Sequence, residues 1–137
     1  MEKPMVLFVC VHNAGRSRIA EALFNRMAGD RYRAISAGTH PASAPHPEVV
    51  ESLEDAGISI SGPGKLLTSA LAGSAARVIG MGCDVDEACP ALKVPLEDWD
   101  LPDPKGKSRA QVDEVRDEIR ARVEGLVAEL DAERGGG

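Results

Sequence analysis

Residues 5–18 of this 137-residue chain read MVLFVCVHNAGRSR, and they combine a buried-strand pattern with the start of a helix. Five apolar residues, 5–9, lead into Cys10, a run typical of a strand inside a parallel sheet. After Ser17 the apolar side chains recur at helical spacing and share one face (Ile19, Ala20, Leu23, Phe24 and Met27). The sequence therefore predicts a strand, a tight loop from Cys10 to Arg16, and a helix.

This loop is suited to a tetrahedral oxyanion. Its main-chain N–H groups, like those that begin the helix, lack intrahelical partners and can converge on one point. Arg16 can complete the site with a bidentate guanidinium. The same positive field stabilises a thiolate, so we expect the pKa of Cys10 to lie below that of a free thiol. Ser17 can add a hydroxyl hydrogen bond to the sulfur, and the expected oxyanion-binding residues are Val11, His12, Asn13, Ala14, Gly15 and Arg16.

A plainer interpretation is a buried cysteine at a strand end beside an ordinary capping loop. Cys-x5-Arg alone is a weak motif. The strand before it, the helix after it and a serine directly following Arg16 favour the catalytic interpretation.

Composition limits the other classes of function. The chain has a net charge of −6 and no basic cluster, so we expect no nucleic-acid partner. No apolar run approaches the ~20 residues that span a bilayer, and residues 1–4 lead directly into the first strand rather than into a signal peptide. We expect a cytoplasmic monomer without membrane contact. Three cysteines are an odd number, which favours redox or catalytic use over a structural disulfide framework.

The run at residues 8–17, FVCVHNAGRS, resembles the phosphate-binding loop of the low-molecular-weight tyrosine phosphatase fold, and most closely the branch with the thiol-coupled arsenate reductases. The resemblance implies one α/β domain over residues 1–137, with a four-stranded parallel sheet, helices on both faces and the phosphate-binding loop after the first strand. The alternation of strand and helix patterns also predicts parallel pairing.

The remaining elements are predicted from local patterns. Further strands are expected at 32–37, 76–81 and 93–96, and helices from Pro47, after Thr68 and after Ser108. Ser108 and Gln111 form a capping box before a long amphipathic run. Gly29 is expected to end the first helix in a left-handed conformation.

Cys83 and Cys89 form a second candidate group, in an acidic segment. A helix would separate them by ~9 Å in rise alone, whereas a disulfide needs Cα atoms within ~7 Å, so pairing requires the segment to unwind. They could instead be structural thiols or half of a metal site. His12, His40 and His46 supply no evident ligand set, so we expect no bound metal or cofactor.

Asp103 lies between two prolines, after the last expected strand. It is either a general acid held over the loop or a solvated turn carboxylate. The resemblance favours the general acid.

The resemblance implies a thiol relay. Cys10 attacks arsenate, Asp103 protonates the departing oxygen, and Cys83 and then Cys89 carry the disulfide to an external reductant. Phosphate or sulfate would compete for the loop.

Two downstream cysteines favour thioredoxin as that reductant, although residues 12–15 and 80–83 resemble members that use mycothiol or a glutaredoxin-like partner. The alternatives are a phosphatase acting on phosphotyrosine or small phosphoesters, which could persist as a weak activity, and a non-enzymatic oxyanion sensor.

The family also suggests how the loop is supported. Asn13, Glu21 and Ser36 match positions that in some reductases hold a potassium ion together with an aspartate. Residues 61–66 contain no carboxylate here, and Lys65 falls near the place of that aspartate. We predict that the ammonium group of Lys65 replaces the ion by donating to oxygens of these three residues. The alternative is an exposed lysine in a turn.

Overall fold

The computed structural model describes residues 4–10, 12–81, 96–99 and 107–135. Val11, Cys83, Cys89 and Asp103 lie outside these ranges. Within them, no helix combines the length and hydropathy needed to cross a membrane.

The sheet is parallel, with the strand order β2-β1-β3-β4. Its strands are β1 (Met5–Cys10), β2 (Arg33–Gly38), β3 (Arg77–Gly80) and β4 (Leu96–Asp98). The strand expected at 93–96 is therefore found from Leu96 onward, and residues 93–95 lie outside the described ranges. In the β1–β2 register Cys10 lies opposite Gly38, so both residues stand at the carboxyl edge of the sheet. Ligands bind at this edge in open α/β sheets.

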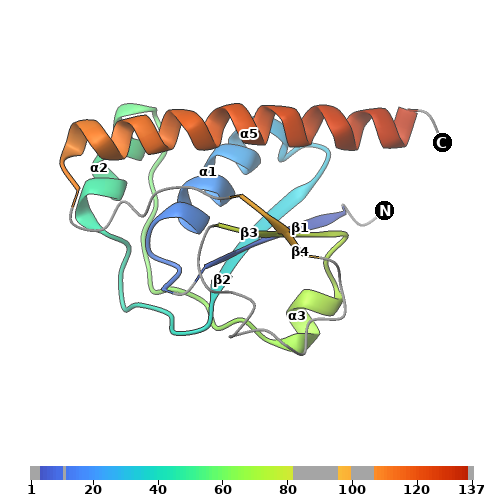
Figure 1. Ribbon diagram of the computed structural model, residues 1–137, viewed down its shortest axis with the longest axis horizontal. Helices are drawn as coiled ribbons and strands as arrows, with labels where there is room; N and C mark the ends of the chain where they lie inside the picture. The colour runs from blue at the N-terminus through green and yellow to red at the C-terminus, as the bar shows by residue number, and fades with distance from the viewer. Residues whose placement is uncertain (1–3, 11, 82–95, 100–106, 136–137) are drawn as a thin grey trace.

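Helices cover both faces of the sheet, as predicted (Figure 1). The helices are α1 (Arg16–Ala28), α2 (Pro47–Asp55), α3 (Ser69–Gly73) and α5 (Arg109–Gly135). Val6 and Phe8 of β1 belong to the larger core, which includes side chains of α1 and α5. Leu7 and Val9 point to the other face and join a smaller cluster with Ala72 of α3. This alternation follows from the two-residue period of a strand.

The end of α1 differs from the prediction. Gly29 has φ −64° and ψ −14°, which is right-handed rather than left-handed. Its N–H donates to the Asn25 carbonyl at 3.0 Å, so the helical pattern continues into the turn. A Cβ at this position would collide with the carbonyl oxygen of Asn25. Glycine is therefore required here by close approach to the backbone, and not by a positive φ.

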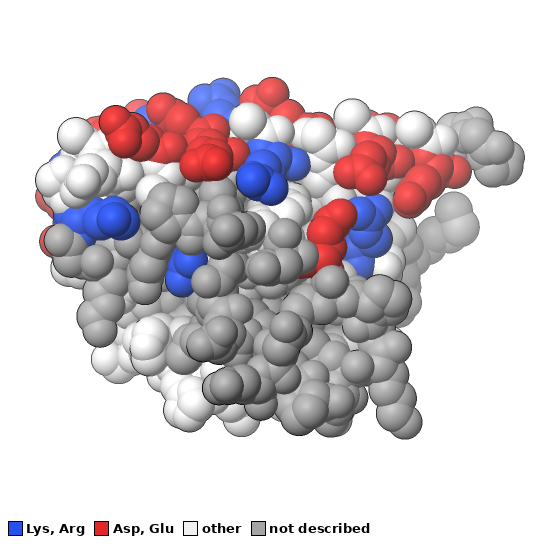
Figure 2. Space-filling view, in the orientation of Figure 1, with Lys and Arg blue, Asp and Glu red and all other residues white. Residues whose placement is uncertain are grey.

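The capping box that precedes α5 is present. The Ser108 N–H donates to Gln111 Oε1 at 3.1 Å, and the Gln111 N–H donates to Ser108 Oγ at 3.3 Å. The apolar side chains predicted to share one face of this helix are all buried: Val112, Val115, Ile119, Val123, Leu126 and Leu130. Figure 2 shows acidic side chains gathered along the outer side of α5, at the top of the view. The helix is thus an amphipathic cover for the core, with a solvated charged face on which arginines lie among the acidic side chains.

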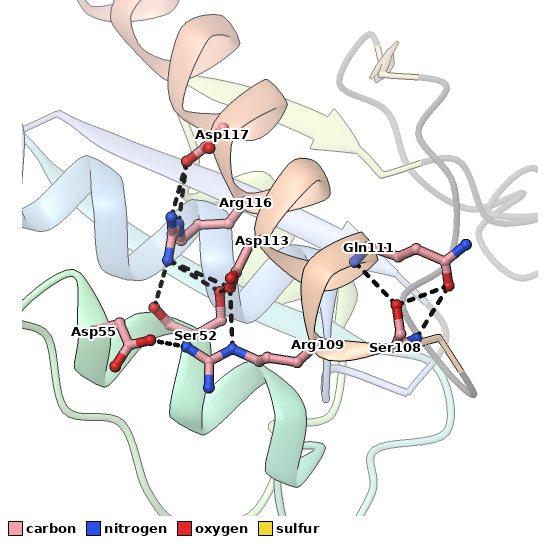
Figure 3. A network of polar contacts seen from close by, with 8 residues as sticks. All are labelled: Ser52, Asp55, Ser108, Arg109, Gln111, Asp113, Arg116 and Asp117. Atoms are coloured by element: carbon pink, nitrogen blue, oxygen red, sulfur yellow. Dashed lines mark hydrogen bonds and ion pairs between the residues drawn. The ribbon is translucent and has the colours of Figure 1, made fainter.

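A polar joint connects α2 to the start of α5 (Figure 3). Ser52 Oγ donates to Asp113 Oδ1 at 2.6 Å, and Arg116 donates to the Ser52 carbonyl at 2.8 Å. Arg109 bridges Asp113, at 3.1 Å, and Asp55. Hydrogen bonding from Ser52, followed by that from Arg109, lowers the pKa of Asp113. The joint therefore fixes the first turns of α5 against α2.

Candidate active site

Cys10 is placed at the carboxyl end of β1, directly before the loop that leads into α1. The residue is 5% exposed. Asn13 has φ +49°, a left-handed conformation that asparagine tolerates better than most residues. The loop therefore curves back on the strand end, and its main chain approaches the sulfur.

In the described part of the chain, Asn13 and Ser17 lie within hydrogen-bond distance of the Cys10 sulfur. The Asn13 N–H donates to Sγ at 3.3 Å, and Ser17 Oγ lies 2.9 Å from Sγ. Asn13 is 1% exposed and Ser17 is completely buried, so bulk water does not compete for these bonds. The arrangement has the geometry expected of a pocket that favours thiolate over thiol.

The side-chain amide of Asn13 decides in which direction the Ser17 hydroxyl points. Asn13 Oδ1 accepts from the main-chain N–H of Lys65 at 2.9 Å, and Asn13 Nδ2 donates to Ser17 Oγ at 2.9 Å. Because a main-chain N–H only donates, the amide oxygen must face Lys65 and the NH₂ group must face Ser17. Ser17 Oγ then accepts from Asn13, which leaves its own proton available to a Cys10 thiolate.

The outer side of the loop is held by the segment after β2. Ala42 N–H donates to the His12 carbonyl at 2.8 Å, and His46 N–H donates to the Ala14 carbonyl at 2.9 Å. These bonds hold two carbonyl oxygens away from the centre of the loop. At the centre, the same oxygens would repel an oxyanion. The loop is thereby braced from outside, and the convergence of its N–H groups on an oxyanion stays a prediction.

The predicted site residues are brought together only in part within the described ranges. Cys10, Asn13 and Ser17 share one hydrogen-bond network, and Arg16, 8% exposed, is the first residue of α1 beside it. No acidic residue lies in the first turn of α1, so the positive end of the helix is not neutralised by its own side chains. The placement of Cys83, Cys89 and Asp103 stays a prediction, since they lie outside those ranges.

The supporting group is assembled differently from the prediction. Ser36 Oγ donates to Glu21 Oε1 at 2.8 Å, and Ser36 N–H donates to Glu21 Oε2 at 3.2 Å. Lys65 Nζ stands 3.7 Å from Glu21 Oε2, with a side chain that is 59% exposed. The link from Lys65 to Asn13 uses the main-chain N–H, and not the ammonium group. Glu21 is already bonded twice by Ser36, so the ammonium group forms only a solvated ion pair.

Sequence reasoning did not identify Arg18 as part of this region. It is 7% exposed and donates to three successive carbonyls, those of Ser61, Gly62 and Pro63. The available signal was a second arginine in the first turn of a helix, where a positive charge opposes the helix dipole.

Known proteins with a similar sequence are phosphatases and arsenate reductases. The model of the low molecular weight phosphotyrosine protein phosphatase family matches residues 5–135. A Halobacterium salinarum protein, provisionally named an arsenate reductase, is 39% identical over 130 residues, which cover 90% of both chains. Arsenate reductase 2 of Staphylococcus haemolyticus is 32% identical over 127 residues, 90% of this chain and 96% of the relative.

Solved structures with the same fold include reductases and phosphatases. The thioredoxin-dependent arsenate reductase of Corynebacterium glutamicum is 37% identical with a TM-score of 0.79, over 97% of this chain but 64% of that one. An arsenate reductase in its phosphate-binding state is 31% identical with a TM-score of 0.82, over 92% and 98% of the two chains. The YwlE arginine phosphatase with a phosphorylated active-site serine is 27% identical with a TM-score of 0.83, over 95% and 97%. The chain therefore belongs to the low-molecular-weight phosphotyrosine protein phosphatase family.

Proposed function

We propose that this protein reduces arsenate to arsenite, with Cys10 as the nucleophile. The observation that carries the proposal is the buried Cys10 sulfur, which accepts from the Asn13 N–H and lies 2.9 Å from Ser17 Oγ at the start of α1. Such a pocket favours the thiolate, the form of cysteine that attacks. The names of the curated relatives support arsenate as the oxyanion.

The first step joins sulfur to arsenic. The Cys10 thiolate attacks As(V) held by the loop N–H groups and Arg16, and one arsenate oxygen departs as water. Asp103 is proposed to supply the proton to that oxygen. Arg16 offers paired N–H donors to the remaining oxygens, which a lysine could not do in the same geometry.

The second and third steps move two electrons and regenerate Cys10. The Cys83 thiolate attacks Cys10 Sγ, and the electron pair of the S–As bond passes to arsenic, which leaves as arsenite. The Cys89 thiolate then attacks Cys83 Sγ and displaces the Cys10 thiolate. A dithiol of thioredoxin reduces the resulting Cys83–Cys89 disulfide, so that each arsenate consumes two electrons from the external reductant.

Thioredoxin is the proposed partner because the sequence carries both downstream cysteines, and because the Corynebacterium glutamicum relative is described as thioredoxin-dependent. Mycothiol, or a glutaredoxin-like protein, is the alternative reductant. The two are distinguished by whether Cys89 is needed, since a small thiol can attack in its place.

Phosphomonoester hydrolysis is the second candidate function. It needs the same thiolate and Arg16, and the YwlE arginine phosphatase shares the fold. Phosphate cannot accept electrons from sulfur as arsenate does, so that reaction ends in hydrolysis and leaves the other two cysteines unused.

One assay separates these functions. Reduced protein is incubated with arsenate, thioredoxin, thioredoxin reductase and NADPH, or with mycothiol and its reductase, and NADPH oxidation is followed. We expect arsenate-dependent oxidation that Cys10→Ser and Cys83→Ser abolish and that phosphate inhibits competitively. Hydrolysis of p-nitrophenyl phosphate or phosphoarginine that requires Cys10 but not Cys83, without arsenate turnover in either system, would reject the reductase and support the phosphatase.

A further inference from the structure

Arg18 occupies an unfavourable position for a cation. It lies in the first turn of α1, close to the positive end of the helix dipole, and it is 7% exposed. Its bonding partners in the described part of the chain are neutral: Nη2 donates to the Ser61 carbonyl at 2.9 Å, and Nη1 donates to those of Gly62 and Pro63 at 3.2 and 3.4 Å. A buried guanidinium is costly to desolvate, so these bonds must be fully formed to keep it there.

The three carbonyls come from consecutive residues, 61–63, which pass beside the first turn of α1. Gly62 has φ +89°, the conformation that favours glycine, which allows consecutive carbonyls to face one guanidinium. The planar fork of arginine can bond all three, whereas an ammonium group is a single point of charge. Arg18 therefore determines the path of residues 61–63 over α1.

Gly64 and Lys65, which follow this segment, contact the catalytic loop. Gly64 packs so closely that a Cβ there would lie 3.1 Å from Asn13 Cβ and 3.1 Å from the His12 carbonyl oxygen. Lys65 then presents its N–H to Asn13 Oδ1 at 2.9 Å, while its carbonyl accepts from the Gly38 N–H at 2.8 Å. The segment is thus held by Arg18 at one end and by the end of β2 at the other, with Asn13 between them.

We propose that Arg18 is a positioning residue for the Cys10 thiolate. By fixing residues 61–65, it places the Lys65 N–H so that the Asn13 amide is held in one orientation, and Asn13 in turn directs the Ser17 proton to Cys10 Sγ. The proposal rests on Cys10 being the nucleophile of the proposed function, but it concerns the ionisation of the sulfur and not the identity of the substrate.

The test measures the pKa of Cys10 in a Cys83→Ser/Cys89→Ser background, where Cys10 is the only thiol. Thiolate absorbance near 240 nm is titrated, and the rate of alkylation at pH 5 is compared with that at pH 9. Arg18→Met keeps the length of the side chain without the fork. We expect it to raise the pKa of Cys10 by about 0.5–1 unit, less than the loss of a whole hydrogen bond to sulfur would give. The ratio of the two alkylation rates should then fall about three- to tenfold.

Two further variants separate positioning from general stability. Arg26 lies on the same helix, is exposed and donates to the Gly57 carbonyl at 3.0 Å, so Arg26→Met removes an arginine–carbonyl bond outside this network and should leave the Cys10 pKa unchanged. Gly64→Ala crowds Pro41 Cβ at 3.0 Å and Asn13 Cβ and the His12 carbonyl at 3.1 Å while keeping the Arg18 side chain, so it shifts the segment relative to the loop and should raise the pKa as Arg18→Met does. Arg18→Lys should give a smaller rise, since it keeps the charge and one of the bonds.

The outcomes are distinguishable. A Cys10 pKa near 8.5 in the background protein would remove the basis of the proposed function itself. A low pKa in the background protein that is unchanged in Arg18→Met and Gly64→Ala would overturn the positioning role alone. An alkylation rate reduced equally at both pH values would also overturn it, because it would indicate altered access rather than altered ionisation. If Arg18→Met does not fold, Arg18→Lys and Gly64→Ala decide the question by the same measurement.

Discussion

Replacing Ser17 by alanine should raise the pKa of Cys10 more than any change outside the catalytic loop. Ser17 Oγ lies 2.9 Å from the sulfur and is completely buried, so no bulk water takes its place. A hydrogen bond to a charged group contributes about 1.5–3 kcal/mol, and one pKa unit corresponds to about 1.4 kcal/mol. The pKa of Cys10 should therefore rise by about 1–2 units.

The assay is the pH dependence of kcat/KM for arsenate, together with the direct titration of the thiolate. The acid limb of the profile should move to higher pH by the same 1–2 units or so, while activity recovers at alkaline pH. Ser52→Ala is the matched control, because Ser52 is equally buried but donates to Asp113, in the joint between α2 and α5. That variant should lose about 1 kcal/mol of stability without moving the profile.

Two results would refute the reasoning. A Ser17→Ala protein whose Cys10 titrates within about 0.3 units of the unmodified protein would show that Ser17 does not stabilise the thiolate, since the expected effect is several times larger. A uniform loss of kcat/KM at every pH would instead assign Ser17 to substrate placement.

Three further changes test other parts of the structure. Lys65→Ala removes an exposed ion pair at 3.7 Å, so we expect its free energy of unfolding to fall by less than about 1 kcal/mol. Activity of the unmodified protein that strongly requires potassium over sodium would contradict the idea that Lys65 supplies the cation. The pKa of Asp113 is lowered by hydrogen bonding from Ser52. Its stabilising effect should be complete above about pH 4 and lost as the pH falls through the folded-state pKa. Asp113→Asn should therefore flatten the acid side of the stability curve measured by urea denaturation, and an unchanged curve would assign the acid sensitivity elsewhere. Cys89→Ser exposed to one round of arsenate should accumulate a Cys10–Cys83 disulfide in peptide maps, whereas full turnover with thioredoxin would remove Cys89 from the relay.

The sequence was sufficient where the signal is local. The strand–loop–helix unit around Cys10 and the buried face of α5 follow from periodicity within a few turns of chain, and both are confirmed. The capping box at Ser108 is a pattern of four residues and is confirmed for the same reason. Gly29 shows the limit of such patterns: a glycine after a helix was expected to adopt a positive φ, but close approach to the Asn25 carbonyl accounts for it.

Contacts between distant segments were not predictable in their detail. The resemblance correctly brought Lys65 to the neighbourhood of Asn13, 52 positions away, but the bond is made by the main chain. Almost every residue has the same main-chain N–H donor, so a pattern of side chains does not predict which N–H forms a long-range bond. The bonds from Arg18 to carbonyls 43–45 positions away also use main-chain atoms, so in residues 61–63 only Gly62, which permits the turn, reflects them.

The hydrogen bonds on Cys10 affect the proposed relay twice, and their two effects differ in size. While the pKa of a thiol lies above 7, lowering it by one unit raises the thiolate fraction at pH 7 by up to about tenfold, but intrinsic nucleophilicity falls about threefold. The first attack on arsenate therefore gains only about threefold. In the third step Cys10 is the leaving group, displaced when Cys89 attacks Cys83, and a thiol of lower pKa leaves faster. In this third step, stabilisation of the Cys10 thiolate by Ser17 and Asn13 is not offset by a loss of nucleophilicity, because Cys10 leaves rather than attacks. We expect the departing sulfur to regain both hydrogen bonds as its charge develops. In the proposed relay, the network around Cys10 is thus better matched to releasing the thiolate from the Cys10–Cys83 disulfide than to the initial attack, and we expect it to favour exchange toward the Cys83–Cys89 pair.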